Sequence, residues 1–511
     1  MRVRGWSWRG CGCCRVRDAW LAVLAGVLTC VPYLVAWALT PPGHVFSGFL
    51  LASQDCETYL FKVRLGEMGR WWENWYSPHP GPPAMLFWPY VLLGRLGGLL
   101  GVPAILTFHL GRVAAAFALA LGLFALAREL RIAPWWVPLA GFFWCGPDAA
   151  FLVPAAPEAR VAWAALALPH FALCQAAACW CLVFWLRSRR GGVGWAAAAG
   201  AACAVVGSVH PYMAALPAGA CGVDAASRVR AWAWTWRDAA IRWLAVVVGG
   251  AAGAGWVARE IFRLEWLREW LVQSRVLLPG PVVLSEVLAV DAVLCAAGVR
   301  EWLRSGRPDG RVLAAAWVGL TAVLCTVPVV PGLDFRGRCL EGLAPVLALF
   351  PVLGAFALSR KCKAVAVVLV AGVSAGLLAF CVRSAVLGAG DPVAYLPREL
   401  DAAFRWLAEE ASGSVVLSDP ATSNRVPSRA LCRTVAGHWA ESPGYRELAP
   451  VLRGFFSESD PGLQKAVLER FRPDYVLWRC DVFPGAGLEE LRGLEPVWER
   501  GPVVILAWRG G

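Results

Sequence analysis

The sequence predicts an all-α polytopic membrane protein that carries a small α/β domain at its C-terminal end. Of its 511 residues, 58% are hydrophobic and only 16% are charged, which is typical of a chain with many membrane spans. The hydrophobic residues are gathered into runs long enough to cross a bilayer. After about residue 387 this pattern gives way to short segments typical of a soluble α/β domain.

The chain begins with a basic segment, residues 1–18, followed by an apolar run over residues 19–39. The run is long for the apolar core of a signal peptide and has no cleavage site of small residues, so it predicts a retained first span with the basic tail in the cytoplasm. The net charge of +12 does not indicate a nucleic-acid partner, because most Arg and Lys residues lie in short loops between apolar segments.

Further apolar segments are long enough to span the membrane. Residues 193–227 are interrupted by His210-Pro211 and predict two short spans folded back on each other. With the other segments this makes about eleven crossings: 102–127, 134–153, 163–186, 240–256, 281–299, 312–330, 339–358 and 364–384.

Basic residues fall between these segments in six clusters, which all become cytoplasmic only if residues 84–100 do not cross the membrane. That stretch contains a proline and three glycines and is barely long enough to span, so we expect a juxtamembrane or re-entrant element. The predicted organisation is a transmembrane domain over residues 19–386, with a large first outer loop at 40–101, and an extracytoplasmic domain over 387–511. We expect a multi-pass protein of the inner (plasma) membrane. The six clusters are the N-terminal tail, Arg128/Arg131, Arg187/Arg189/Arg190, Arg228/Arg230/Arg237, Arg300/Arg304/Arg307/Arg311 and Arg360/Lys361/Lys363.

The C-terminal segment predicts helices at residues 401–411, 445–456 and 463–471, and strands at 414–417, 475–478 and 503–507. Two cysteines of this segment, Cys432 and Cys480, could form a disulfide if the segment is extracytoplasmic. The cluster Cys11, Cys13 and Cys14 in the tail could bind a metal or carry a lipid, although it lacks the second ligand pair of a zinc site.

The first outer loop is rich in charged and aromatic residues. A helix over residues 54–68 would place Asp55, Tyr59 and Lys62 on one face and would suit the membrane surface. Other rare polar residues are expected on the same outer side, among them His79, Glu158, His210, Arg336, Arg338 and Glu341, with Arg112 pointing the same way. Each alone could be structural, and the loop could be an ordinary solvated one. Their convergence on one side indicates a site.

Several short motifs recur in order along nearly the whole chain, and through them the chain resembles the GT-C membrane glycosyltransferases. That superfamily includes the protein mannosyltransferases and the aminoarabinose transferase of lipid A, and the chain looks like a bacterial branch of it. Each motif is weakly specific, so the resemblance depends on their order and spacing. The motifs are Asp55-x-x-x-Tyr59-Leu60-x-Lys62, Pro157-Glu158, Pro169-His170-Phe171, His210-Pro211-Tyr212, Arg338-x-x-Glu341-Gly342 and Gly437-His438-Trp439.

The resemblance implies an enzyme that transfers a sugar from a polyprenyl-phosphate donor to an envelope glycan, lipid or protein on the outer face of the membrane. Asp55 would be the catalytic base, with Glu57 and Glu158 as further candidates. The donor phosphate would meet Lys62, Arg112, Arg336 and Arg338. The substrate cavity would include Tyr59, His79, His170, His210 and Glu341.

A divalent cation could take part, because Asp55 with Glu158 could offer oxygen ligands. Many relatives have two adjacent acids where this chain has Asp55-Cys56-Glu57, and this departure weakens a metal assignment and leaves open whether Glu57 faces solvent. The sequence contains no nucleotide-binding or soluble-hydrolase motif.

Two other classes of protein fit the composition. A transporter or flippase of lipid-linked glycans would also have many spans, broken helices and buried charges, but it should show internal repeats, and none is evident. A non-catalytic envelope assembly protein could have kept the same scaffold without the activity.

Overall fold

The computed structural model describes residues 12–132, 135–145, 159–305, 310–327, 335–359, 381–382, 386–458, 460–484 and 493–510. The chain divides into two compact units, which we call the bundle unit and the sheet unit. The bundle unit comprises Met1–Val35, Leu110–Arg259 and Arg275–Arg383. The sheet unit comprises Ala36–His109, Glu260–Ser274 and Ser384–Gly511, and therefore joins the predicted first outer loop to the C-terminal segment.

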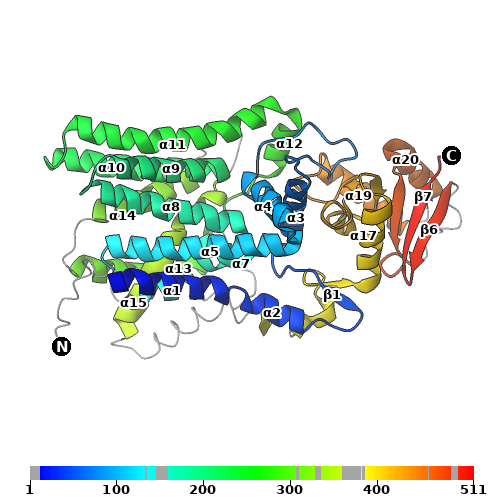
Figure 1. Cartoon of the computed structure of the whole chain (residues 1–511), viewed down its shortest axis with the longest axis horizontal. Helices are drawn as coiled ribbons and strands as arrows, with labels where there is room; N and C mark the ends of the chain where they lie inside the picture. The colour runs from blue at the N-terminus through cyan, green and yellow to red at the C-terminus, as the bar shows by residue number, and fades with distance from the viewer. Residues whose placement is uncertain are drawn as a thin grey trace. The chain divides into compact units, whose positions relative to one another are not determined.

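The bundle unit is helical, and the long axes of α5, α8, α9, α10 and α11 run in about the same direction (Figure 1). Three helices, α2, α5 and α11, begin in one unit and end in the other. The helices that lie wholly or partly in the bundle unit are α1 (Gly12–Leu28), α2 (Val31–Ala38), α5 (Ala104–Glu129), α6 (Val137–Phe142), α7 (Val161–Ala167), α8 (Pro169–Ser188), α9 (Gly194–Val209), η3 (Pro211–Met213), α10 (Ala215–Arg230), α11 (Trp236–Arg263), α13 (Pro281–Arg304), α14 (Arg311–Thr326), η5 (Arg338–Leu343) and α15 (Ala344–Ser359).

Most predicted spans in the described residues coincide with helices of this unit. Within the described residues, five helices are long and apolar enough to cross a membrane, and α9 and α14 are shorter apolar helices of 16 residues each. Nearly all of the predicted span at 364–384, and residues 134 and 146–153 of the one at 134–153, lie outside the described residues. The count of about eleven crossings therefore stays a prediction. The five helices are Arg15–Ala38, Ala104–Glu129, Pro169–Ser188, Trp236–Arg263 and Arg338–Ser359.

The predicted interruption at His210-Pro211 is confirmed, because α9 ends at Val209 and α10 starts only at Ala215. Proline has no N–H to donate and disfavours helical backbone in the residue before it. His210 accordingly has φ −129° and ψ 87°, outside the helical region. This break turns the His210 side chain into the bundle unit, where it is buried.

The sheet unit contains the helix predicted in the first loop, α3 (Ser53–Glu67), and it packs against α4 (Trp88–Leu100). A Cβ on Gly94 would lie 1.9 Å from the Val63 carbonyl oxygen, so glycine is needed for the two helices to approach this closely. The 13 residues of α4 extend about 20 Å, less than the roughly 30 Å of a bilayer core. This length is compatible with the predicted non-crossing element.

A five-stranded sheet, ordered β4-β3-β5-β7-β6, forms the C-terminal part of the sheet unit. β3 pairs parallel with β4 and β5, whereas β7 pairs antiparallel with β5 and β6. A separate antiparallel pair, β1 with β2, joins the start of the first loop to the C-terminal segment. The strands are β1 (His44–Phe46), β2 (Tyr395–Pro397), β3 (Val415–Leu417), β4 (Arg433–Thr434), β5 (Tyr475–Arg479), β6 (Leu494–Arg500) and β7 (Val503–Trp508).

Both faces of this sheet are covered, because alternate residues of each strand enter different cores. Leu417, Trp478 and Leu506 pack with residues of α19 and α20 on one face. Val416 and Leu477 pack with residues of α17 on the other. The helices of the C-terminal segment are α17 (Arg398–Glu410), α18 (Pro420–Ser423), the π-helical turn η7 (Val426–Ala430), α19 (Tyr445–Ser457) and α20 (Pro461–Phe471), and α12 (Glu265–Gln273) also belongs to the sheet unit.

The predicted helices and strands of the C-terminal segment all form within a few residues of their expected bounds, but β2, β4, β6, α18 and η7 were not predicted. Strand β6 was missed because its residues alternate poorly between apolar and polar. The possible disulfide is not formed, since Cys432 and Cys480 are both free thiols. Cys432 is buried beside α17, and Cys480 packs against the core on the opposite face of the sheet.

Candidate functional site

Asp55 lies in the first turn of α3, where the helix dipole favours a negative charge. Its side chain keeps 38% of its surface exposed, and its Oδ1 is 3.1 Å from Nε2 of His438. His438 is 383 residues away in the sequence and is buried in the same unit. Asp55 is therefore a carboxylate that is open to solvent on one side and held by an imidazole on the other.

The protonation state of His438 follows from its hydrogen bonds. The backbone N–H groups of Ala440 and Glu441 both donate to Nδ1, at 3.3 and 3.2 Å. An Nδ1 that accepts these bonds carries no proton, so the proton of the neutral ring is on Nε2 and is donated to Asp55. Protonating His438 would break both backbone bonds. The imidazole thus fixes the orientation of the Asp55 carboxylate without adding a charge to it.

Lys62, two turns further along α3, is fully buried and donates to Oε1 of Glu441 at 2.8 Å. Its ammonium lies over the rings of Tyr59, Trp72 and Phe87, at 4.9, 4.8 and 4.3 Å from their centroids. Burial lowers the pKa of Lys62, and the charges of Glu441 and Asp55 oppose this only in part. Lys62 and Tyr59 do share a face, as predicted, but this face points into the protein.

Glu441 has a second oxygen, Oε2, that is buried and has no hydrogen-bond partner among the described residues. The same residue joins the two halves of the network, because its backbone N–H holds His438 and its carboxylate holds Lys62. Asn74 also donates to its carbonyl oxygen at 2.7 Å. Glu441 therefore keeps one buried acceptor atom that no described residue occupies.

Glu57 is buried at 1% exposure, and both of its oxygens are engaged. Oε1 and Oε2 accept from Nη2 and Nε of Arg429 at 2.7 and 3.0 Å, and Oε2 also accepts from the Ser428 hydroxyl at 2.5 Å. Glu57 therefore does not face solvent, which resolves the uncertainty raised by the sequence. Its predicted catalytic role remains a prediction, which this geometry does not favour.

Two further predicted residues have different surroundings. The side chain of His79 is exposed in a turn of the sheet unit. Arg112 on α5 is buried in the bundle unit and donates to Thr29 Oγ1 at 2.8 Å and to the Ala165 carbonyl oxygen at 3.2 Å. Its guanidinium also lies 4.3 Å from the ring centroid of Tyr33. Arg112 thus links α5 to the turn after α1 and to α7.

The bundle unit brings together a second polar group around Glu341 of η5. Glu341 is fully buried, with Oε2 at 2.6 Å from Nδ1 of His210 and 3.4 Å from the hydroxyl of Tyr212. The ring of His170 at the start of α8 is 5.2 Å from the His210 ring. Arg336, just before η5, and Arg338, its first residue, are both half-buried. Glu158 lies outside the described residues.

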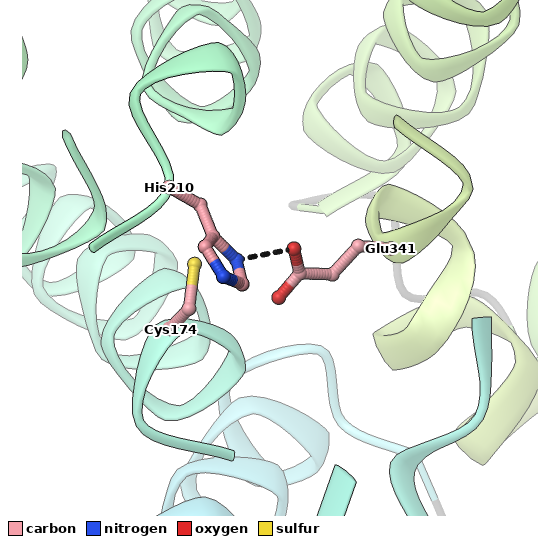
Figure 2. A group of neighbouring side chains, drawn as sticks. All are labelled: Cys174, His210 and Glu341. Carbon is pink, nitrogen blue, oxygen red and sulfur yellow. Dashed lines mark hydrogen bonds and ion pairs between the residues drawn. The ribbon is translucent and has the colours of Figure 1, made fainter. Parts of the chain in front are cut away.

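Cys174 is the neighbour of this group that sequence reasoning missed. Its sulfur, a ring nitrogen of His210 and a carboxylate oxygen of Glu341 all lie within 4.8 Å of one another, and all three residues are buried (Figure 2). The chain has 18 cysteines, most of them scattered along apolar helices, so nothing in the sequence distinguishes this one. Only its i, i+4 relation to His170 on α8 could have drawn attention to it.

His438 and Glu441 were also absent from the predicted site. The Gly437-His438-Trp439 motif pointed to this region without giving it a role. The signal that could have found them is the polar run from His438 to Ser442 inside an otherwise apolar and loop-rich segment.

Comparisons with known proteins give similarity at the level of structure alone. No protein-family model matches the sequence, and no curated protein matches it. Among solved structures, the arabinofuranosyltransferase AftD from mycobacteria matches with a TM-score of 0.55 and 19% identity over 96% of this chain. This chain spans 41% of the length of that protein.

The oligosaccharyltransferase AglB of Archaeoglobus fulgidus, in complex with an inhibitory peptide and a dolichol-phosphate, matches with a TM-score of 0.54 and 12% identity. The match covers 91% of this chain and 70% of AglB. ArnT from Cupriavidus metallidurans aligns over 94% of this chain and 97% of its own length, at 14% identity and a TM-score of 0.49. From the first two matches, the chain has the fold of the GT-C membrane glycosyltransferases, as the motifs suggested.

Proposed function

We propose that the chain is a membrane glycosyltransferase that moves a sugar from a polyprenyl-phosphate donor to an envelope acceptor, with Asp55 as the catalytic base. The observation that carries the proposal is the Asp55 carboxylate, half open to solvent and oriented by a neutral imidazole. The fold agrees with it, since AftD and AglB are transferases of sugars.

The proposed reaction is attack of an acceptor hydroxyl or amide on the anomeric carbon of the donor, as the bond from sugar to lipid phosphate opens. Asp55 takes the proton from the acceptor. His438 acts as a positioning residue, because the N–H group at its Nε2 donates a hydrogen bond to Oδ1 of Asp55.

The lipid phosphate requires positive partners that a ligand can reach. Of the four cations predicted for this role, Lys62 and Arg112 are buried against protein groups. We assign the donor phosphate to Arg336 and Arg338, which keep part of their surface exposed. Arg338 is preferred, because a guanidinium can bind a phosphate through two parallel hydrogen bonds.

The donor class is proposed by analogy with AglB, whose structure holds a dolichol-phosphate. The acceptor is proposed only as a class: a glycan, lipid or protein of the cell envelope. The proposed location is the inner membrane, with the N-terminus in the cytoplasm and the C-terminal domain outside, as the six basic clusters predict. A topology reporter fused after residue 190 should read cytoplasmic, and one fused after residue 511 should read extracytoplasmic.

The test is a transfer assay in proteoliposomes that contain the purified full-length chain, a panel of polyprenyl-phosphate sugars, and envelope glycans, lipids or proteins as acceptors. Wild-type protein should consume one donor and release the polyprenyl phosphate, and the Asp55→Asn variant should lose this activity while inserting normally. A Glu409→Gln variant, on the exposed surface of α17, is the matched control. Movement of intact donor across the bilayer without loss of the sugar would instead support the flippase reading and overturn the proposal.

A further inference from the structure

Three residues from separate parts of the bundle unit converge on one point. Cys174 comes from α8, His210 from the break after α9, and Glu341 from η5. In Figure 2 the His210 ring lies beside the Cys174 sulfur and faces the Glu341 carboxylate, so the three side chains point toward one another. Each contributes one donor atom to a set that spans no more than 4.8 Å.

The group has an unfilled acceptor. Oε1 of Glu341 is buried and has no hydrogen-bond partner among the described residues, while Oε2 carries the contacts to His210 and Tyr212. A buried carboxylate oxygen without a partner is costly, because burial removes the water that would otherwise solvate it. The Cys174 thiol also interacts with this carboxylate, but a thiol is a weak donor, so Oε1 stays poorly satisfied, whereas a bound cation would satisfy it.

We propose that Cys174, His210 and Glu341 form a binding site for a divalent cation of the zinc class. Nothing in the proposed transfer reaction uses this group, so the inference is independent of Asp55. The donor set of one sulfur, one nitrogen and one oxygen excludes magnesium and calcium, which prefer all-oxygen sites. Zinc takes all three donor types in a tetrahedral arrangement, with bonds of about 2.0–2.3 Å.

The geometry requires only a small adjustment to accept the ion. Ligands of a tetrahedral zinc site lie roughly 3.3–3.7 Å apart, as follows from those bond lengths. The present donors, within 4.8 Å of one another, would contract around the metal, while Nδ1 of His210 and Oε2 of Glu341, now 2.6 Å apart, would separate slightly. The Tyr212 hydroxyl at 3.4 Å from Oε2 is placed to orient the carboxylate from behind.

Three protein ligands leave one position of a tetrahedral ion for water or a substrate atom. The ion would also join α8, the α9–α10 break and η5, and would explain why a thiol, an imidazole and a carboxylate are kept in an apolar bundle. Metal binding displaces the thiol proton of Cys174 and the proton held between Nδ1 of His210 and Oε2 of Glu341, and both are released to solvent, so no other reactant is needed.

The experiment uses the full-length chain, purified in detergent without a histidine tag and freed of metal with a chelator. Zn²⁺ is added and bound metal is measured by mass spectrometry, and Co²⁺ is added in parallel to record the thiolate-to-cobalt absorption. The variants are Cys174→Ala and Glu341→Gln. Cys179→Ala is the matched control, because Cys179 is a buried cysteine of the same helix outside the group.

Wild type and Cys179→Ala should each bind one ion per chain and show the thiolate absorption. Cys174→Ala should lose that absorption and bind Zn²⁺ at least about tenfold more weakly, and Glu341→Gln should also bind more weakly. Absence of saturable binding by wild type, or equal binding by Cys174→Ala, overturns the proposal.

If a variant fails to fold, the wild-type protein alone still gives an answer. Bound Zn²⁺ should slow the alkylation of Cys174 by N-ethylmaleimide, measured peptide by peptide, and leave the rate at Cys179 unchanged. Equal rates at Cys174 with and without Zn²⁺ would reject the site. Neither readout depends on sugar transfer, so failure of this inference is separate from failure of the proposed function.

Discussion

Two buried glutamates, one in each unit, show how different the surroundings of similar residues are in this protein. Glu57 in the sheet unit is 1% exposed and Glu341 in the bundle unit 0%. Arg429 and Ser428 occupy both oxygens of Glu57, whereas one oxygen of Glu341 has no partner among the described residues. Burial alone therefore does not distinguish the two glutamates. They differ in how many of their carboxylate oxygens have hydrogen-bond partners within the protein.

Asp55 completes this comparison, because it lies two residues before Glu57 and has the opposite environment. Its side chain is 38% exposed, and its Oδ1 lies 3.1 Å from Nε2 of the His438 imidazole. Within one turn of α3, one acid therefore keeps part of its surface open to solvent and the other fixes the helix to η7. The following predictions test this division, from the largest expected effect to the smallest.

Asp55→Asn should lower the rate of transfer by about 10²–10⁴-fold, the usual cost of losing a general base. Asparagine keeps the shape and can still accept a hydrogen bond from His438, so yield and thermal unfolding should match wild type. The measurement is the initial rate of polyprenyl-phosphate release. Near-normal transfer would move the catalytic role to Glu57 or Glu158.

Glu57→Gln should lower the free energy of unfolding by about 3–5 kcal/mol, because it leaves the guanidinium of Arg429 without its buried partner. Transfer per folded molecule should stay close to wild type. The measurement is thermal unfolding in detergent, with activity normalised to folded protein. A stable variant without activity would show that Glu57 is catalytic after all.

Lys62→Met should also lower stability, by about 3–5 kcal/mol, because Glu441 would be left as a buried charge. The double variant Lys62→Met/Glu441→Gln should recover most of the loss, since it buries no charge. Both are measured by thermal unfolding. A variant Lys62→Met that unfolds normally but binds the donor poorly would instead support the predicted role of Lys62 in phosphate binding.

Arg338→Lys should weaken donor binding by about tenfold and leave the unfolding temperature unchanged, because lysine offers a point charge in place of a planar pair of donors. The measurement is the affinity of purified protein for the polyprenyl-phosphate sugar. The alternative role for Arg338 is a simple ion pair near the surface. Such a pair contributes about 0–1 kcal/mol to stability and tolerates replacement by lysine. Unchanged affinity would leave Arg338 with a structural role.

The smallest effect expected is a pH dependence of stability from Lys62. Burial holds its pKa below the ordinary value, so the unfolded chain binds more protons than the folded chain between those two pKa values. Stability therefore rises with pH in that window, by at most about 1.4 kcal/mol per pH unit. Just below the ordinary lysine pKa of 10.5, the unfolding temperature of wild type should therefore increase with pH relative to that of Lys62→Met/Glu441→Gln. A relative decrease would mean that the ion pair with Glu441 outweighs burial.

The helical membrane class, the break at His210-Pro211, the helix in the first loop and the elements of the C-terminal segment could be predicted from the sequence. These features depend on properties that act over a few neighbouring residues: apolar run length, the missing N–H of proline and the periodicity of side chains. Strand β6 was not predicted, because apolar and polar residues do not alternate clearly along it. It forms by pairing with β7. The broad resemblance to GT-C transferases also came from the order of local motifs.

The partners of the charged residues could not be predicted in this way. Asp55 meets His438 across 383 residues, and Lys62 meets Glu441 across 379. No local pattern encodes such a pair, because the two side chains meet only when segments that are far apart in the chain pack together. The sequence therefore determined which residue types could take part in chemistry. The tertiary structure alone decided which of their polar atoms already have a hydrogen-bond partner in the protein and which can still bind a ligand.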